Sequence, residues 1–324
     1  MQNRQHQLLK GNMSLKQYIY GVDLGGTSIK FGLFEEDGFL LEQWSRPTQT
    51  KEQGKQILPD IAEEIAACGK RRALLPEQIK SIGLGVPGEV GVDGFIQPCA
   101  NLNGWGGFDA GKELQKLCGY PTQVINDANA AALGEMHWGS GAKNMVFVTL
   151  GTGIGGGVVM NGKLWCGAHG SAGEFGHMKI CFGENTFWDD WEHYASASAL
   201  ARTAQGELVN PKETLSALST EEKMTARYVV DSAKAGNKQA LSLVQRLCED
   251  LGRGLSVITS VVDPERIVLG GGLAAAGDFL LYPVREAYRR YAFSQTRETP
   301  FYLAKLGADA GIYGAAFCCF AKEN

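Results

Sequence analysis

Three glycine-rich turns in this sequence follow predicted strands, and each could present backbone N–H groups to a ligand. The first reads Asp-Leu-Gly-Gly-Thr at residues 23–27, the second Leu-Gly-Thr-Gly-Ile-Gly-Gly-Gly at 150–157, and the third is the triple glycine at 270–272. Glycine lets the backbone turn sharply and approach a ligand closely, so successive N–H groups can surround a phosphate. Thr27 would add a hydroxyl group and Lys30 a positive charge, and Asp23 is placed to hold Mg²⁺ or its water ligands.

The second turn also matches the Gly-x-Gly-x-x-Gly pattern of dinucleotide-binding proteins, but its context differs. It leads into a predicted strand at residues 158–160, whereas that fingerprint must open a helix. A P-loop is excluded as well, because no Gly-Lys-Ser/Thr ends the glycine run. Each turn alone could be an ordinary hairpin or strand-to-helix turn. Three of them in a repeated pattern favour a nucleotide site.

Polar side chains suited to a polyhydroxylated substrate lie between the glycine turns. Asn101 and Asn103 share a loop with an aromatic side chain, and the pair Asn126-Asp127 ends a short strand and opens a helix. In that position Asp127 could instead be the N-cap of the helix. Residues 173–177 and 192–194 add two carboxylates and two imidazoles. Each sugar hydroxyl both donates and accepts a hydrogen bond, so this combination of amides, carboxylates and imidazoles indicates a sugar site.

The elements that would position these residues occur in two similar cycles. For the first cycle, we expect strands at 18–22, 29–33, 81–86 and 124–125 and helices at 54–68 and 128–137. For the second cycle, we expect strands at 145–150, 158–160 and 266–269 and helices at 240–262 and 310–320. The unit of strand, glycine turn and strand thus occurs twice. This repetition predicts a duplicated α/β fold of two domains around a cleft.

Composition limits the classes of function. The chain has 324 residues and a net charge of −4, so it offers no broad basic surface, and we expect neither a nucleic-acid partner nor a membrane partner. No C-x-x-C pair occurs among the eight cysteines, no run of residues reaches the roughly 18 apolar residues of a membrane helix, and the first sixteen residues are polar. We therefore expect reduced thiols and a cytoplasmic protein.

Six motifs together resemble one known family. In chain order they are the glycine turn at 23–27, Asn-Leu-Asn-Gly-Trp at 101–105, Asn-Asp-Ala-Asn-Ala-Ala-Ala-Leu-Gly-Glu at 126–135, the glycine turn at 150–157, Gly-Glu-Phe-Gly-His at 173–177 and the glycine turn at 269–272. In this order they resemble the ROK family (repressor, open reading frame, kinase), and they are most similar to its bacterial glucokinase-type sugar kinases. The resemblance implies an actin-like ATPase (ribonuclease H-like) fold, and ATP-dependent phosphorylation of a hexose hydroxyl with ATP and Mg²⁺.

The resemblance also implies roles for individual residues. Asp127 matches the catalytic base that takes the proton from the sugar hydroxyl, and Asp23 matches the carboxylate near the metal-bound phosphates. The positions that match the sugar-binding site are Gly88, Asn101, Asn126, Asp127, Glu174, His177 and Glu192. The positions that match the nucleotide site are Gly25, Gly26, Thr27, Lys30, Gly151, Thr152, Gly153, Gly271 and Gly272. In-line positioning, charge neutralisation and a base are what phosphoryl transfer requires.

We divide the chain into a flexible extension at 1–17, an N-terminal domain at 18–134 and a larger C-terminal domain at 135–309. The resemblance implies that a last helix at about 310–324 packs back on the N-terminal domain, and that the protein is a homodimer. Glucose is the first choice of substrate because Glu174, His177 and Glu192 are all present. N-acetylmannosamine, N-acetylglucosamine, fructose, allose and glucosides stay open, and so does a sugar-binding regulator without catalysis.

The segment after His177 departs from the family pattern. Family members hold a structural zinc there with three cysteines and a histidine, whereas this chain has Cys181 alone between His177 and Glu192. One thiolate and one imidazole cannot complete a tetrahedral site, although Glu184, Asp189 or Asp190 could contribute a carboxylate. We therefore expect no structural zinc. Apolar packing by three side chains would replace the metal, namely Phe187, Trp188 and Trp191.

Overall fold

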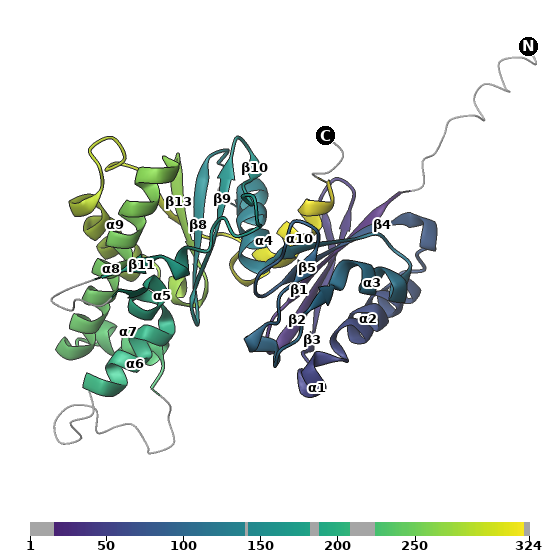
Figure 1. Ribbon diagram of the computed structural model, residues 1–324, viewed down its shortest axis with the longest axis horizontal. Coiled ribbons are helices and arrows are strands. Elements are labelled where there is room, and N and C mark those ends of the chain that lie inside the picture. The colour runs from purple at the N-terminus through teal and green to yellow at the C-terminus, as the bar shows by residue number, and fades with distance from the viewer. Residues whose placement is uncertain (1–15, 140–141, 182–187, 208–223, 321–324) are drawn as a thin grey trace, which may run out of the picture.

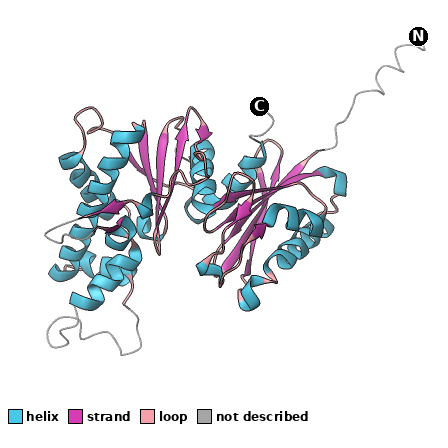
Figure 2. Cartoon of the chain, viewed as in Figure 1, coloured by secondary structure: helices cyan, strands magenta, loops and turns pink. Residues whose placement is uncertain are grey.

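The computed structural model describes residues 16–139, 142–181, 188–207 and 224–320. Residues 1–15 of the extension expected at 1–17 therefore lie outside the described residues. The described chain forms two five-stranded sheets with helices on both faces of each, and two short two-stranded sheets (Figure 1, Figure 2). No helix of the described ranges combines the length and the apolar character that crossing a membrane requires.

The first sheet is built on a hairpin. β1 and β2 are antiparallel and pair Tyr18 with Glu35 and Leu24 with Ile29, and β4 and β7 then add in parallel. Side chains alternate along β1, so that Tyr20 faces one layer of helices and Ile19 the other. In order across the sheet, the described strands are β3 (Leu40–Pro47), β2 (Ser28–Glu35), β1 (Tyr18–Leu24), β4 (Ile79–Val86) and β7 (Thr122–Asn126).

The second sheet repeats this arrangement. β8 and β9 form an antiparallel hairpin, β13 adds to β8 in parallel, and β14 adds to β13 in parallel. In order across the sheet, the described strands are β10 (Lys163–Leu164), β9 (Ile154–Met160), β8 (Met145–Leu150), β13 (Arg266–Gly270) and β14 (Phe301–Leu303). When the five strands of each sheet are numbered along the chain, both sheets have the spatial order third, second, first, fourth, fifth. The duplication expected from the sequence is therefore confirmed.

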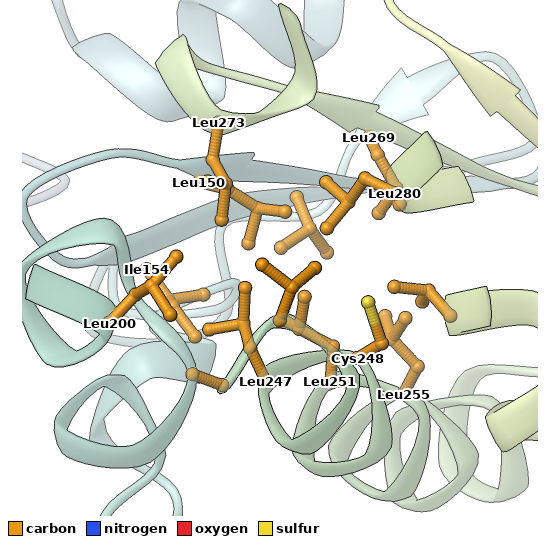
Figure 3. Close-up of a cluster of buried hydrophobic side chains, with 14 of the residues drawn as sticks. Leu150, Ile154, Leu200, Leu247, Cys248, Leu251, Leu255, Leu269, Leu273 and Leu280 are labelled. Carbon is orange, nitrogen blue, oxygen red and sulfur yellow. The ribbon is translucent and has the colours of Figure 1, made fainter. Parts of the chain in front are cut away.

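Two groups of amphipathic helices cover the outer faces of the sheets. α2 (Ile57–Arg71) and α3 (Ala110–Cys118) bury apolar side chains against the first sheet. Figure 3 shows the corresponding core of the second half, where Leu247, Leu251 and Leu255 of a long helix face Leu150 and Leu269 of the sheet. The helices of this second group are α5 (Trp191–Ala195), α6 (Ala197–Glu207), α7 (Ala226–Lys234), α8 (Lys238–Val262) and α9 (Asp278–Tyr291).

Two further helices lie between the sheets and pack on each other (Figure 1). α10 (Ala310–Phe320) contacts β1 and β4, and α4 (Asp127–Gly134) contacts β8 and β9. Glycine lets α10 pack closely on the first sheet and on α4, because a Cβ added at Gly83 would lie 1.7 Å from the carbonyl oxygen of Ala315, and one added at Gly314 would lie 1.6 Å from that of Ala130. The layers therefore run sheet, α10, α4, sheet.

Short elements complete the described chain. They are α1 (Lys51–Gly54), β5 (Phe95–Ile96), β6 (Phe108–Asp109), β11 (Lys179–Ile180), β12 (Asp189–Asp190), the 3₁₀ helices η1 (Pro76–Gln78), η2 (Ala100–Leu102), η4 (Phe175–His177), η5 (Gly272–Ala276) and η6 (Gly307–Asp309), and the π-helical turn η3 (Glu135–Gly139). The π-helical turn corrects one expectation, because the helix expected at 128–137 ends as an α-helix at Gly134. The segments that form β3 and α9 were not predicted as elements from the sequence.

Candidate active site

A cavity of about 610 Å³ opens between the two halves and brings together most of the polar residues singled out in the sequence. This volume lies within the usual range of small-molecule sites, about 300–1,000 Å³. The first half contributes residues 87–89 and 97–101, the start of α4 contributes 126–128, and the second half contributes 149, 151–155, 174, 177 and 192. All seven positions expected to bind sugar line this cavity, namely Gly88, Asn101, Asn126, Asp127, Glu174, His177 and Glu192.

Asp127 is the first residue of α4 and is partly buried. Its Oδ1 accepts a hydrogen bond from the backbone N–H of Ala128 at 2.7 Å. Burial raises the pKa of Asp127 to about 7, and the negative charges of Asp23 and Glu174 contribute to the rise. A carboxylate with a pKa near neutrality can accept a proton during a reaction, which is the property expected of a general base.

Asn126 is the residue that caps α4. Its Oδ1 accepts from the N–H of Asn129 at 3.0 Å, and its Nδ2 donates to the carbonyl of Gly88 at 3.0 Å. The alternative that Asp127 is the N-cap is therefore wrong. Because Asn126 provides the cap, the carboxylate of Asp127 is left to face the cavity.

The acidic wall of the cavity comes from the second half. Glu192 lies in α5, and its Oε2 accepts from the backbone N–H of Ile154 at 3.1 Å. A Cβ added at Gly153 would lie 2.1 Å from this oxygen, so the glycine turn leaves the space that the carboxylate occupies. Burial raises the pKa of Glu174, while the nearby His177 opposes the rise.

His177 lies at the rim, with 61% of its side chain exposed. Its Nδ1 is 3.4 Å from Oδ2 of Asp190, and Asp190 also pairs with Lys179. The short strand pair β11–β12 brings these groups together. The carboxylate therefore fixes one ring nitrogen of His177 and leaves Nε2 for another partner.

The second and third glycine turns lie against each other. In the second turn, the N–H of Gly151 donates to the carbonyl of Gly153 at 3.0 Å, and Thr152 between them is exposed. In the third, Gly271 has φ +81° and approaches β8 so closely that an added Cβ would lie 2.6 Å from the backbone nitrogen of Leu150. No heavy atom lies within 4 Å of a Cβ added at Gly272, so this side of the turn is open.

The first glycine turn borders the cavity without lining it. Thr48 ties the turn down, because its Oγ1 donates to the carbonyl of Gly25 at 2.6 Å and its N–H donates to that of Thr27 at 3.0 Å. A Cβ added at Gly26 would lie 3.3 Å from the carbonyl oxygen of Asn101, which does line the cavity. Lys30 points elsewhere, since its Nζ donates to the carbonyl of Ala308.

The carboxylate of Asp23 lies beside the N-terminal end of α10. A Cβ added at Gly311 would lie 2.6 Å from its Cγ and Oδ2. Burial raises the pKa of Asp23, the positive charge of Lys30 opposes the rise, and Asp309 adds to it. The negative charge of Asp23 in turn contributes to the raised pKa of Asp127. Carboxylate oxygens are the ligands that Mg²⁺ prefers, so the carboxylate of Asp23 fits the role of a ligand to Mg²⁺ or to its waters.

Several residues of the cavity wall were not predicted from the sequence. Glu89 lines it and raises the pKa of Glu174, and Cys99 lies near Gly88, with its Sγ 3.7 Å from a Cβ added there. Their signal in the sequence was weak, because they lie in a loop whose only marked residues are the Pro-Gly before it and the Asn-rich motif after it. The other wall positions outside the predicted motifs are Pro87, Gln97, Pro98, Ala100 and Thr149, whereas Ala128, Ile154 and Gly155 lie within motifs but were given no role of their own.

The segment after His177 corrects another expectation. Trp191 is fully buried and donates from Nε1 to the carbonyl of Asp250 at 3.0 Å, whereas Trp188 is 70% exposed and does not pack in the core. Phe187 and Glu184 lie outside the described residues. Among the residues that are described, no three His, Cys, Asp or Glu side chains come together as a metal site. The absence of zinc stays a prediction.

Comparisons of the sequence and of the structure with known proteins point to the same family. The model of the ROK family matches residues 19–322. A glucokinase of Halalkalibacterium halodurans is 37% identical over 96% of this chain and 97% of its own, and an N-acetylmannosamine kinase of Citrobacter koseri is 32% identical over 91% and 96%. A ROK family glucokinase from Streptomyces griseus, solved in complex with glucose and AMPPNP, has a TM-score of 0.77 and 29% identity over 95% of this chain and all of its own. This structural match confirms the expected fold class.

Proposed function

The chain belongs to the ROK family, and we propose that it transfers the terminal phosphoryl group of ATP to a hydroxyl of a hexose, with glucose as the preferred substrate. The observation that carries this proposal is the position of Asp127. Its carboxylate has a pKa of about 7. It lines the same cavity as the glycine turn at 151–153 and the side chains of Glu174, His177 and Glu192. A glucokinase relative solved with glucose and AMPPNP has the same fold, which supports the choice of both substrates.

In the proposed reaction, Asp127 takes the proton of the attacking hydroxyl. The hydroxyl oxygen then forms a bond to the terminal phosphorus of ATP while the bond to the bridging oxygen breaks, and ADP leaves. Positioning of the two reactants supplies much of the rate enhancement in phosphoryl transfer. The hydrogen bond from Ala128 fixes one carboxylate oxygen of Asp127, which leaves the other for the substrate proton.

The wall of the second half would orient the sugar. Glu192 uses one oxygen on the N–H of Ile154, and its other oxygen can accept from a sugar hydroxyl. Glu174 offers a second acceptor, and Nε2 of His177 a third polar contact at the rim. From the first half, the exposed amide of Asn101 can both donate and accept. Residues of both halves would therefore have to contact one sugar ring.

The glycine turns would hold the nucleotide. The N–H groups of Gly25 and Gly151 bond within their own turns, so the backbone N–H groups at 26–27 and 152–153 are those that can face the phosphates. The open side of the third turn at Gly272 can lie against the purine ring. Mg²⁺ fits beside Asp23, and when bound it would neutralise phosphate charge. Lys30 would act on the nucleotide through its effect on Asp23, because its Nζ is engaged by the carbonyl of Ala308.

The experiment that tests the proposal is a coupled assay of ADP release with a panel of hexoses. We expect ADP release to depend on sugar and to be fastest with glucose. The panel includes N-acetylmannosamine, N-acetylglucosamine, fructose, allose and a glucoside, because a change of one side chain in a pocket alters sugar preference by only a few kcal/mol. Calorimetric binding of glucose without ADP release from any sugar would instead identify a regulator.

A further inference from the structure

Glu135 is a carboxylate that the reaction does not use and that is fully buried. It opens the π-helical turn η3 directly after α4. Its Oε2 accepts from the backbone N–H of Lys305 at 3.0 Å, and its Oε1 accepts from that of Leu306 at 2.7 Å. A buried carboxylate is costly unless it is well hydrogen-bonded, and here both oxygens have a donor.

These two hydrogen bonds join the two places where the chain passes between the halves. The first passage leaves α4 through η3 towards β8, and the second leaves β14 through residues 304–309 towards α10. The carboxylate is also confined from its own side of the chain. A Cβ added at Gly139 would lie 1.9 Å from Oε2 of Glu135, so the last residue of the turn packs directly on it.

α4, which precedes the first passage, and α10, which follows the second, are in backbone contact. A Cβ added at Gly134 would lie 2.5 Å from the carbonyl oxygen of Ala310, and one added at Gly314 would lie 1.6 Å from that of Ala130. The end of α4 therefore meets the start of α10, and the two helices run antiparallel. Glu135 holds this junction at the end of α4 opposite to Asp127.

We propose that Glu135 is a positioning residue, which fixes the pivot about which the two halves turn when sugar binds and thereby fixes the place of Asp127. This inference rests on the function proposed above. α4 has eight residues, so it is about 12 Å long. A tilt of about 5° at the Glu135 end would move the Asp127 end by about 1 Å, and a misplacement of this size can cost about a hundredfold in rate.

The substitution Glu135→Gln tests the proposal with little change of shape. The amide keeps one acceptor, but its NH₂ group faces one of the two N–H donors and leaves that donor unpaired. In the protein without sugar, we expect amide hydrogen exchange at Lys305 and Leu306 to become roughly ten- to hundredfold faster. We expect kcat to fall by about ten- to hundredfold, while KM for glucose changes less than about threefold because Glu174, His177 and Glu192 keep their places.

Asp60→Asn is the matched control. Asp60 is a carboxylate with 1% exposure that pairs with Arg46 at 2.9 Å, but both residues lie in the first half. Its substitution should lower the melting temperature and leave kcat, and exchange at Lys305 and Leu306, unchanged. Equal losses of kcat in Glu135→Gln and Asp60→Asn, or unchanged exchange in Glu135→Gln, would overturn the proposal.

Gly139→Ala provides a second variant if Glu135→Gln does not fold. This variant keeps the Glu135 side chain, but the added methyl group displaces its carboxylate. The same increase in exchange at Lys305 and Leu306 and the same fall of kcat are therefore expected. A Gly139→Ala protein with normal exchange and normal kcat would also contradict the role of Glu135. If the wild-type protein releases no ADP with any hexose, the proposed function fails, whereas the exchange measurement still tests the junction on its own.

Discussion

At the scale of single residues, the burial that suits Asp127 to proton transfer also lowers the free energy of unfolding. Its pKa is raised from 3.8 to about 7 in the folded protein, which corresponds to about 4 kcal/mol as an upper limit. Solvent screening of this partly exposed group reduces that figure. Because the folded protein binds the proton more tightly than the unfolded chain, the penalty is largest above pH 7 and disappears as the pH falls towards 4.

Asp127→Asn should therefore separate activity from stability. We expect kcat to fall by roughly 10²–10⁴-fold, the usual effect of losing a general base. We also expect the melting temperature at pH 8 to rise by roughly 2–4 °C for each 1 kcal/mol recovered, and the difference from wild type to shrink at pH 5. Thermal melts at both pH values check the second part, with Asp60→Asn as a carboxylate whose loss should lower the melting temperature. Near-normal turnover would remove Asp127 from the role of base.

The sequence could predict the site at this scale wherever a motif carried the residue. Asp127, Glu174 and Glu192 were found because each belongs to, or lies close to, a polar motif, and all three line the cavity. Glu89 and Cys99 were missed because loop folding, which periodicity does not report, brings them to the wall. The sequence also could not predict which aromatic side chains are buried. Trp188 and Trp191 lie in the same short segment, but only Trp191 is buried.

At the scale of elements, the glycine turn at 150–157, proposed above to hold the nucleotide, also shapes the sugar wall. We expect Gly153→Ala to raise the KM for sugar by about tenfold, the effect of losing a hydrogen bond of about 1–1.5 kcal/mol. The reason is that the new methyl group would displace the end of the Glu192 side chain, whose Oε2 lies 2.1 Å from the added Cβ. The end of a flexible side chain can move easily, so the melting temperature should hardly change.

Steady-state kinetics and a thermal melt check this expectation. Gly206→Ala is the control, because no heavy atom lies within 4 Å of a Cβ added there and the residue is in α6, outside the cavity wall. It should leave KM unchanged. An unaltered KM in Gly153→Ala would show that Glu192 does not contact the sugar.

The segment from β11 to α5 gives a prediction about metal. With Cys181 as its one cysteine and Trp191 buried in the core behind it, the segment has an apolar anchor in place of a set of thiolate ligands. We expect protein purified without chelator to contain far less than one equivalent of zinc, as measured by elemental analysis. Treatment with a chelator should then leave the melting temperature unchanged, and stoichiometric zinc would contradict the prediction.

At the scale of the whole molecule, the repeat could be predicted because hydrophobic runs and glycine turns recur in the same order in both halves. β3 was missed because it is an edge strand of largely polar residues (Leu-Leu-Glu-Gln-Trp-Ser-Arg-Pro), which shows no strong apolar alternation. The pairing of α4 with α10 could not be read either, since it depends on Gly134 and Gly314, which meet backbone far away in the sequence. Two domains, at 18–134 with the last helix and at 135–309, and a homodimer remain our proposals.

The proposed binding of one sugar by both walls leads us to expect that the two halves approach each other when sugar binds. Asn101 comes from the first half, whereas Glu174, His177 and Glu192 come from the second, and they line one cavity that is open to solvent. A sugar that contacts both walls favours the closed form because it binds that form more tightly. Closure also removes water from the reacting groups, which protects the phosphoryl donor from hydrolysis.

We therefore expect saturating glucose to contract the protein, measured as a smaller radius of gyration in small-angle X-ray scattering than without sugar. In the Gly153→Ala protein, the same contraction should need about tenfold more glucose, in parallel with its higher KM, because the weakened contact lies on the sugar wall. In Glu135→Gln, the contraction should occur at the normal glucose concentration, since its sugar-binding side chains are unchanged. Scattering curves that stay the same with and without saturating glucose, in a preparation that releases ADP, would show that the reaction proceeds without closure of the halves.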